Sequence, residues 1–181
     1  MIRYLFNKML LRMQYRYDYD VQYMQNILQN DLGAFFKYMG FQTMAAHTGG
    51  VPSAPLFAAR LRAILWDDCG SCTQLIVNLA LESKVQPNVI HAIIAGNLDE
   101  LPNDVALVVR FTELVLAHNP EADELREKIR ALWGNKGLIA IGFSIGSSRV
   151  YPAFKYSLGY GAACSRITVG GASLEPNRDL A

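Results

Sequence analysis

A Cys-x-x-Cys motif formed by Cys69 and Cys72 constrains this sequence more than any other feature. Two acidic residues, Asp67 and Asp68, precede the motif, and an apolar stretch of residues 75–81 follows it. That stretch favours a helix, and an aspartate at its start would cap it and place both thiols in its first turn. A helix N-terminus is electropositive and stabilises thiolate over thiol. Because residues three apart share a helical face, the motif predicts a reversible disulfide.

Composition limits the classes of partner. The chain has 181 residues, of which 51% are hydrophobic and 18% charged, and its net charge is +1. A large core with a thin charged shell indicates that some apolar surface is buried against another subunit. A net charge so close to zero leaves no electrostatic footprint for nucleic acid. We therefore expect a homo-oligomer that does not bind nucleic acid.

The cysteine count and the apolar runs bear on the compartment. A single close pair and one distant residue, Cys164, do not form the disulfide framework of a secreted domain. Residues 1–16 mix Arg and Lys with apolar residues and lack the unbroken apolar run of a signal peptide. The longest apolar run, residues 137–146, is shorter than the roughly 20 residues that span a bilayer. These patterns predict a cytoplasmic protein with no membrane partner, in which Cys164 is a lone buried thiol or, alternatively, a redox partner.

Helical periodicity begins near the N-terminus. Apolar residues recur at steps of three and four from Tyr17 to Met39, and Gly40 is the expected end of this helical stretch. A second stripe at spacing four flanks the first and consists of Tyr15, Tyr19 and Tyr23. This tyrosine stripe is either an aromatic platform for a ligand or a second packing face of an amphipathic helix.

Proline and glycine divide the rest of the chain into helices. Prolines at 55, 87 and 102 suit the first turns of helices, while Gly96 and Gly134 suit helix ends. Pro152 should bend or interrupt a further helix over residues 138–158. The tail after Gly159 is weak strand or coil, and no useful period-two run occurs elsewhere. The predicted fold class is all-α, with boundaries at residues 1–50, 51–160 and 161–181.

The order of these elements resembles that of the AhpD-like/carboxymuconolactone decarboxylase family. The resemblance covers roughly residues 55–159: a helix, the Cys-x-x-Cys that opens a second helix, a short helix ending in AGNLDELP (residues 95–102), and a long helix. It implies an AhpD-like multi-helical domain at residues 51–160, with residues 1–50 as a helical extension and 161–181 as a tail. It also implies a trimer or hexamer. Thiol members of this family act as dithiol peroxidases or disulfide reductants.

The resemblance implies separate roles for the two cysteines. Cys72 would meet the peroxide, and Cys69 would resolve the sulfenic acid as a disulfide. Peroxidase members also carry a Glu and a His that relay protons, but the matching positions here are Phe57 and Ile76. General-base assistance contributes about 10²–10⁴-fold, so we expect weak peroxidase activity. His91, in the helix after Pro87, is the candidate substitute base, and its alternative is a surface or structural role, as for His47 and His118.

Three functions remain open on the sequence alone. The first is a thiol-dependent antioxidant or disulfide-exchange protein, acting on a small-molecule hydroperoxide or a protein disulfide partner. The second is a catalytically degenerate member that binds a small molecule or serves as an oligomeric interaction module. The third, a cofactor-free lactone decarboxylase, is disfavoured because that activity belongs to members without the Cys pair. A zinc site would need two further ligands, so we expect neither metal nor cofactor.

Overall fold

The computed structural model describes residues 1–161 and 167–177. Within these ranges helices dominate and the only sheet is a two-stranded hairpin, which confirms the all-α prediction. The elements are α1 (Ile2–Tyr17), α2 (Gln22–Asn30), α3 (Leu32–Ala45), α4 (Ser53–Trp66), α5 (Gly70–Glu82), α6 (Pro87–Ala95), the 3₁₀ helix η1 (Leu98–Glu100), α7 (Asn103–Leu116), α8 (Ala122–Ser157), β1 (Ile167–Val169) and β2 (Ala172–Leu174).

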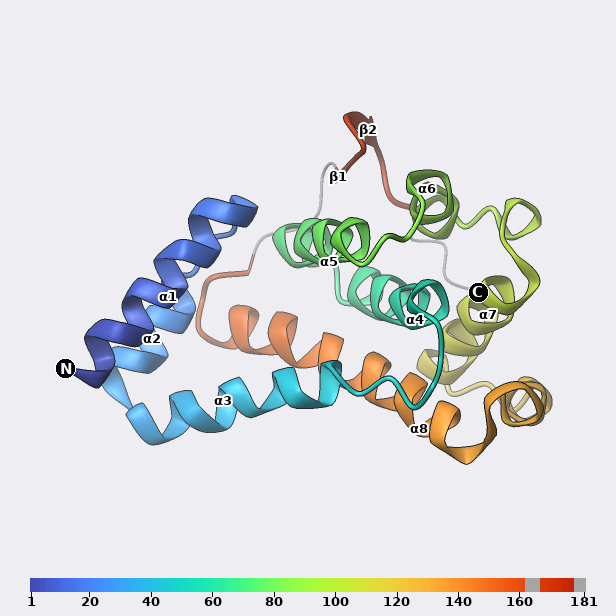
Figure 1. Ribbon diagram of the computed structural model, residues 1–181, viewed down its shortest axis with the longest axis horizontal. Coiled ribbons are helices and arrows are strands. Elements are labelled where there is room, and N and C mark those ends of the chain that lie inside the picture. The colour runs from blue at the N-terminus through green and yellow to red at the C-terminus, as the bar shows by residue number, and fades with distance from the viewer. Residues whose placement is uncertain (162–166, 178–181) are drawn as a thin grey trace.

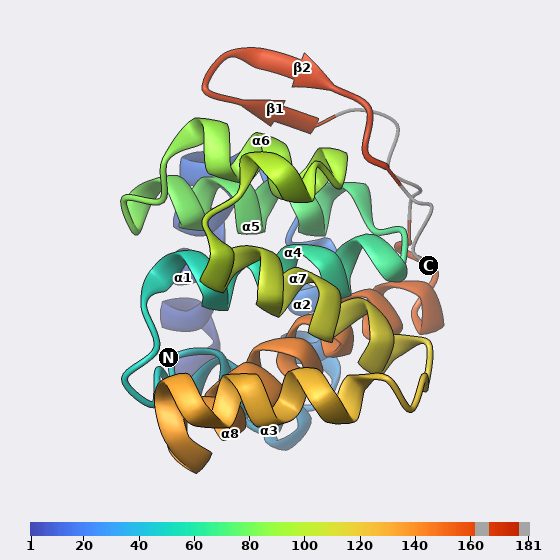
Figure 2. The same ribbon diagram turned by 90° about the vertical axis from the view of Figure 1, so that its right-hand side faces the viewer.

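Helix α4 is the centre of the larger core. It packs against α5, α6, α7 and α8, as Figures 1 and 2 show. Three of its alanines, Ala58, Ala59 and Ala63, are fully buried. Small side chains at the contact allow helix axes to approach closely, so α4 can be enclosed by several neighbours at once.

Local signals set several helix ends as predicted. Helix α6 begins at Pro87 and ends before Gly96, whose φ of 75° is the left-handed conformation that glycine adopts without strain. Gly134, with φ 66° and ψ −173°, breaks the helical geometry inside α8. Of the two effects expected at Pro152, a bend or an interruption, the interruption is wrong, because α8 continues to Ser157. Pro152 is buried, and packing along this helix outweighs the loss of one backbone hydrogen bond.

The N-terminal region is helical but more divided than its periodicity indicates. Helix α1 ends at Tyr17, and Asp31 separates α2 from α3. The Asp31 carboxylate accepts a hydrogen bond from the Ala34 amide at 2.9 Å, so it caps α3 and forces the chain into an extended conformation between the two helices. Gly40 does not end a helix, since α3 runs on to Ala45.

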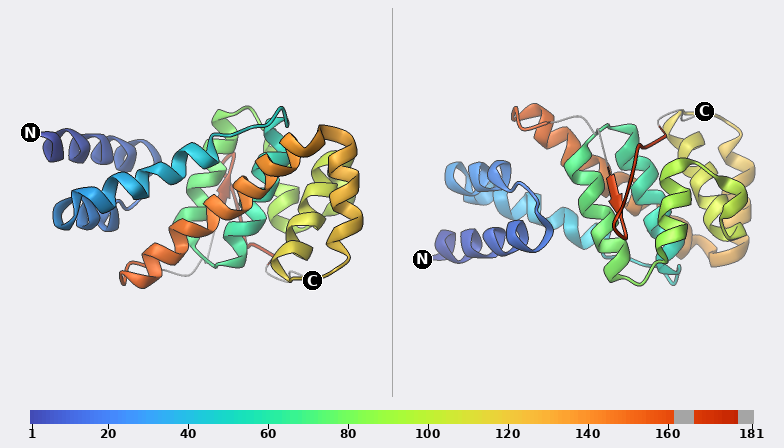
Figure 3. Two further views of the ribbon diagram at one scale, coloured as in Figure 1. Left: turned by 90° about the horizontal axis from the view of Figure 1, so that it is seen from below. Right: turned by 90° about the horizontal axis from the view of Figure 1, so that it is seen from above.

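These N-terminal helices form an arm with its own small core. Figures 1 and 3 show α1 and α2 side by side, projecting from one end of the molecule, with α3 lying along α8. A buried cluster joins the arm helices and includes Tyr19, Tyr23, Phe35 and Tyr38. Leu75 of α5 and Tyr151 of α8 pack against this cluster and connect the arm to the main body.

The C-terminal hairpin lies over α5 and α6 (Figure 2). Its turn is Gly170-Gly171, with φ of 56° and 90°, as the tightest hairpin turns require. The Gln74 side chain of α5 bonds both backbone groups of Thr168, accepting at 2.8 Å and donating at 3.0 Å. The hairpin matches the strand alternative given for the tail.

Candidate functional site

The cysteine pair opens α5 in a different way from that expected. Cys69 is itself the N-cap residue, and Cys72 is the third residue of the helix. Neither Asp67 nor Asp68 caps α5, so that expectation is wrong. The two sulfurs lie at disulfide-bonding distance and the Cα atoms are 5.3 Å apart. Because Cys72 lies among the unpaired N–H groups of the first turn, a thiolate formed there on reduction would be stabilised.

Asp67, which directly follows α4, forms an ion pair with an arginine. Arg149 of α8 donates from Nη2 to the Asp67 carboxylate at 2.9 Å and from Nε at 3.0 Å. This hydrogen-bonded pair raises the pKa of Arg149. The ion pair offsets the negative charge of Asp67, which therefore opposes thiolate formation less than the sequence indicates.

Both cysteines are buried between the two cores, with 0% of Cys69 and 2% of Cys72 exposed. They pack with Ile64 of α4, and Ile76 covers them from the next turn of α5. Burial in apolar surroundings holds the sulfurs away from bulk solvent. Any reactant must therefore reach them through an interior space.

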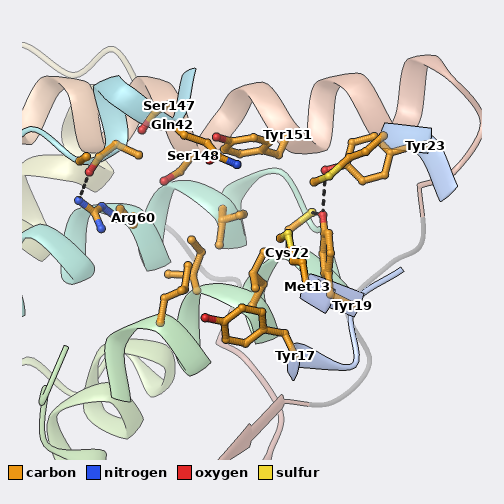
Figure 4. Close-up of a pocket in the computed structure, with 17 residues that line it drawn as sticks. Met13, Tyr17, Tyr19, Tyr23, Gln42, Arg60, Cys72, Ser147, Ser148 and Tyr151 are labelled. Atoms are coloured by element: carbon orange, nitrogen blue, oxygen red, sulfur yellow. Dashed lines mark hydrogen bonds between the residues drawn. The ribbon is translucent and has the colours of Figure 1, made fainter. Parts of the chain in front are cut away.

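Such a space lies beside Cys72. A cavity of about 360 Å³, open in part to solvent, lies between the arm on one side and α4, α5 and α8 on the other (Figure 4). Cys72 lines this cavity and Cys69 does not. The remaining lining residues are Met13, Tyr17, Tyr19, Tyr23, Met24, Gln42, Ala45, Ala46, Arg60, Ile64, Leu75, Ile76, Leu79, Ser147, Ser148 and Tyr151. The two sulfurs are thus inequivalent: a bound molecule would meet Cys72 first.

A row of tyrosine hydroxyls leads away from Cys72 into the arm. The Tyr19 hydroxyl lies 3.8 Å from Cys72 Sγ and 3.1 Å from the Tyr23 hydroxyl, which in turn lies 2.6 Å from that of Tyr38. Burial raises the pKa of all three tyrosines. The hydroxyls therefore remain protonated, and the Tyr19 hydroxyl can donate a hydrogen bond to a thiolate at Cys72 but cannot serve as a base.

A buried lysine approaches the dithiol from α8. Lys155 is 2% exposed, and its Nζ donates to Ser71 Oγ at 2.7 Å. The same ammonium lies 4.9 Å from the ring centroid of Tyr19 and 5.3 Å from that of Tyr23. In the described ranges it forms no direct ion pair with a carboxylate. Burial lowers its pKa, although the charge of Asp20 acts in the opposite direction. A cation held here would stabilise a cysteine thiolate.

The predicted histidine does not belong to this arrangement. His91 is exposed on α6 and does not line the cavity, and His47 and His118 are also exposed. Ile76 does line the cavity, while Phe57 is buried in the main core. The prediction for Cys164 concerns a residue outside the described ranges.

Of the two alternatives for the tyrosine stripe, packing is confirmed for Tyr19 and Tyr23, and a ligand platform stays a prediction. Tyr19 and Tyr23 are buried core residues and also line the cavity, whereas Tyr15 is 94% exposed. Lys155 and Tyr38 were missed by sequence reasoning, since no local pattern connects either of them to the cysteines. The available signal was a lysine within the apolar and aromatic stretch of residues 150–156.

No group of three or more His, Cys, Asp or Glu in residues 1–161 and 167–177 is placed to hold a metal ion. No helix within these ranges has both the length and the apolar character that crossing a membrane requires.

Comparison with protein-family models, with curated proteins and with solved structures gives no match. The resemblance to the AhpD-like family therefore stays a prediction from the motif and the order of the helices. Function has to be argued from the geometry beside Cys72.

Proposed function

We propose that the chain is a thiol-dependent oxidoreductase in which the dithiol of Cys69 and Cys72 cycles with its disulfide. The observation that carries this proposal is the asymmetry of the pair. Cys72 lies in the first turn of α5 and lines a cavity, and Cys69 is bonded behind it. A redox dithiol needs this division between a sulfur that meets the substrate and a sulfur that resolves the intermediate.

Disulfide exchange is the principal reaction in this proposal. The Cys72 thiolate attacks one sulfur of a substrate disulfide, the substrate S–S bond breaks, and the leaving thiolate takes up a proton. Cys69, deprotonated in turn, attacks Cys72 Sγ and expels the second substrate thiol. Two electrons pass from the protein dithiol to the substrate, which leaves as two thiols. An external dithiol then restores the reduced protein.

Hydroperoxide reduction is a slower reaction of the same site. The Cys72 thiolate attacks the terminal oxygen of the hydroperoxide, the O–O bond breaks, and the alkoxide leaves as an alcohol after protonation. Cys69 then attacks the sulfenic sulfur, forming the disulfide and releasing water. Apolar Ile76 lies where a base could have taken the thiol proton, so thiolate formation is supported instead by the helix terminus, Tyr19 and Lys155.

The test uses reduced protein in which Cys164 is replaced by Ser, so that only the pair reacts. Mixing with hydroxyethyl disulfide should remove both free thiols and form an intrachain disulfide. Cys69→Ser should trap a mixed disulfide on Cys72, whereas Cys72→Ser should react slowly. Equal rates for the two single variants would contradict the assigned division of roles. An unchanged count of two thiols after oxidation of the unaltered pair would overturn the proposed function.

The second candidate function is ligand binding without turnover. The observation that favours it is the cavity itself, which is largely apolar and lined by residues from six helices and from the segments that follow α1 and α3. A chain that binds a small molecule here would not need a reactive dithiol. It would bind equally well with the disulfide intact and with both cysteines replaced by serine.

A homo-oligomer, trimeric or hexameric by the family resemblance, is part of the proposal. Large apolar side chains are exposed along one end of the arm and along α8, and they include Ile2, Tyr4, Leu5, Met9, Leu11, Ile139, Phe143 and Phe154. A second copy covering these side chains would remove apolar surface from water. Sedimentation at micromolar concentration tests this, and a species of one chain mass would contradict it. A cytoplasmic location is also proposed, because the cytoplasm keeps thiols reduced and would supply the external dithiol that restores the reduced pair.

A further inference from the structure

We propose that the cavity beside Cys72 binds an amphipathic monocarboxylate, with its anionic group held by Arg60 and its apolar body alongside Cys72. As a statement about the substrate, this inference rests on the proposed function. As a statement about binding, it stands without any reaction of the cysteines.

The first observation is a cation without a counter-ion. Arg60 of α4 lines the cavity, its guanidinium lies 4.7 Å from the Phe57 ring centroid, and it donates to the Ala45 carbonyl and to Ser144 Oγ. None of these partners carries negative charge. Burial lowers the pKa of Arg60, which means that the surroundings disfavour its charge.

Two other arginines that pack on the body of the molecule each have a carboxylate partner. Arg62, which is more deeply buried than Arg60, is paired with Glu113 at 2.6 Å, and Arg149 is paired with Asp67. The described residues offer Arg60 no such carboxylate. An anion entering from the cavity would supply the missing charge, and a guanidinium matches a carboxylate in shape as well as in charge.

The second observation is a buried hydroxyl in the same cavity wall that forms no hydrogen bond with the described residues. Ser147 is 1% exposed and lines the cavity, and its Oγ finds no hydrogen-bond partner among the residues that the structure describes. Burying a hydroxyl without a partner costs roughly 1–3 kcal/mol. A ligand oxygen that accepts from Ser147 would remove that cost.

Tyr151 adds a third donor at this end of the cavity. Burial raises the pKa of its hydroxyl to about 12, although the nearby Arg60 guanidinium acts in the opposite direction, so the hydroxyl remains protonated. In Figure 4 the Tyr151 hydroxyl points toward the side where Ser147 and Gln42 lie. Arg60, Ser147 and Tyr151 together offer one positive charge and two neutral donors, which suits a group with a single negative charge.

The rest of the cavity is lined by apolar side chains and therefore favours a ligand whose remaining part is apolar. Its lining beyond the polar end includes Met13, Met24, Ile64, Leu75, Ile76 and Leu79. In the view of Figure 4, Cys72 lies between the polar end and Tyr19 with Tyr23. The volume of about 360 Å³ lies at the small end of the range of roughly 300–1,000 Å³ for small-molecule sites. A single chain or ring with one carboxylate fits this distribution, and its middle would pass Cys72.

The experiment compares decanoate with decanol, two probes that differ in charge but share an apolar chain. Binding is measured by calorimetry to the full chain with the disulfide intact, and to Cys69→Ser/Cys72→Ser. We expect decanoate to bind about tenfold more tightly than decanol to both proteins. Arg60→Gln should remove this preference, while Arg130→Gln, which alters an exposed arginine on α8, should retain it.

Equal or tighter binding of decanol to the unaltered chain would overturn the inference, and this comparison needs no variant to fold. Unchanged decanoate affinity in folded Arg60→Gln would also overturn it. Preferential binding of decanoate together with an unreactive dithiol would contradict only the proposed function. A reactive dithiol without any preference for decanoate would contradict only the inference.

Discussion

Lys155 Nζ donates a hydrogen bond to Ser71 Oγ across 2.7 Å, from a buried side chain at the electropositive end of α5. Ser71 Oγ in turn lies 4.0 Å from Cys69 Sγ, so one hydroxyl separates the ammonium from the dithiol. The N-terminus of a helix carries a partial positive charge, which repels a nearby cation. The Lys155 ammonium is therefore disfavoured while the disulfide is intact. Asp20 acts in the opposite direction to burial and raises the Lys155 pKa, and reduction followed by loss of a proton would add a second negative charge near this ammonium.

Replacing Lys155 by Met should therefore raise the pKa of the reactive cysteine. The ammonium favours thiolate through its charge, and its removal should shift the thiol titration upward by about one unit, equivalent to about 1.4 kcal/mol. The measurement is the ultraviolet absorbance of the thiolate across pH in reduced protein carrying Cys164→Ser. At neutral pH the rate of disulfide exchange should fall in proportion to the lost thiolate.

A matched control is Lys128→Met, which removes an exposed ammonium that pairs with Glu124 near the start of α8. This variant should leave the thiol titration unchanged. Equal shifts in the two variants would indicate a general effect of net charge. An unshifted titration in Lys155→Met alone would contradict the role given to this lysine.

Tyr19→Phe should act on Cys72 through the loss of a single hydrogen bond. The hydroxyl of Tyr19 lies 3.8 Å from Cys72 Sγ and can donate to the thiolate, which lowers the thiol pKa. Its loss should slow the reaction of Cys72 with disulfides by about threefold to tenfold at neutral pH, as expected for one hydrogen bond of about 1 kcal/mol. Stopped-flow rates in the Cys69→Ser background isolate Cys72. The exposed Tyr15→Phe serves as the control, and an equal loss there would refute the assignment.

The three linked tyrosines should limit stability in alkaline solution. Burial raises the pKa values of Tyr19, Tyr23 and Tyr38 above the ordinary value of 10.0. A raised folded-state pKa contributes stability that is fully present below pH 10 and is lost as pH rises above it, because only the unfolded chain then releases these protons. Tyrosinate absorbance should show these hydroxyls titrating together with the loss of helical circular dichroism. Ionisation of all nine tyrosines in a chain that stays helical would contradict this.

The sequence predicted those features that depend only on neighbouring residues, such as helix ends and the spacing of the two cysteines. Pro87 and Gly96 bound α6 and Gly134 breaks α8, because each fixes backbone conformation whatever surrounds it. The division at Asp31 also had a local signal, an N-cap residue, but the longer apolar period obscured it. The dithiol was predictable because its spacing alone sets the distance between the sulfurs.

The surroundings of the dithiol could not be predicted in the same way. Ser71 and Lys155 are 84 positions apart, and Cys72 and Tyr19 are 53 apart. Their contacts depend on how α8 and the arm pack on α5, which no local pattern specifies. His91 was chosen for its nearness in sequence, yet it is exposed on α6. Residues that tune a buried site come from whichever helices pack over it.

The final prediction concerns the apolar residue that covers the cysteines. Ile76 lines the cavity one turn beyond Cys72, so Ile76→His would place an imidazole where it can accept the thiol proton. The rate of oxidation by cumene hydroperoxide should rise about tenfold to a hundredfold, at the lower end of general-base effects because nothing orients the ring. Phe57→Glu would not orient it, since Phe57 lies against Arg60 and a carboxylate there would pair with that guanidinium.

Leu79→His is the matched control, because Leu79 lines the same cavity and lies two turns from Cys72 on the same helix. Only an imidazole close to the sulfur should accelerate the reaction, so Leu79→His should resemble the unaltered chain. The gain in Ile76→His should also grow as pH rises through the ordinary histidine pKa of about 6.5, because only the neutral ring accepts a proton. Circular dichroism excludes the trivial case in which a buried polar ring unfolds the site. Equal acceleration by both histidines, or a gain independent of pH, would show that the cavity was merely opened and that proton transfer does not limit the reaction at Cys72.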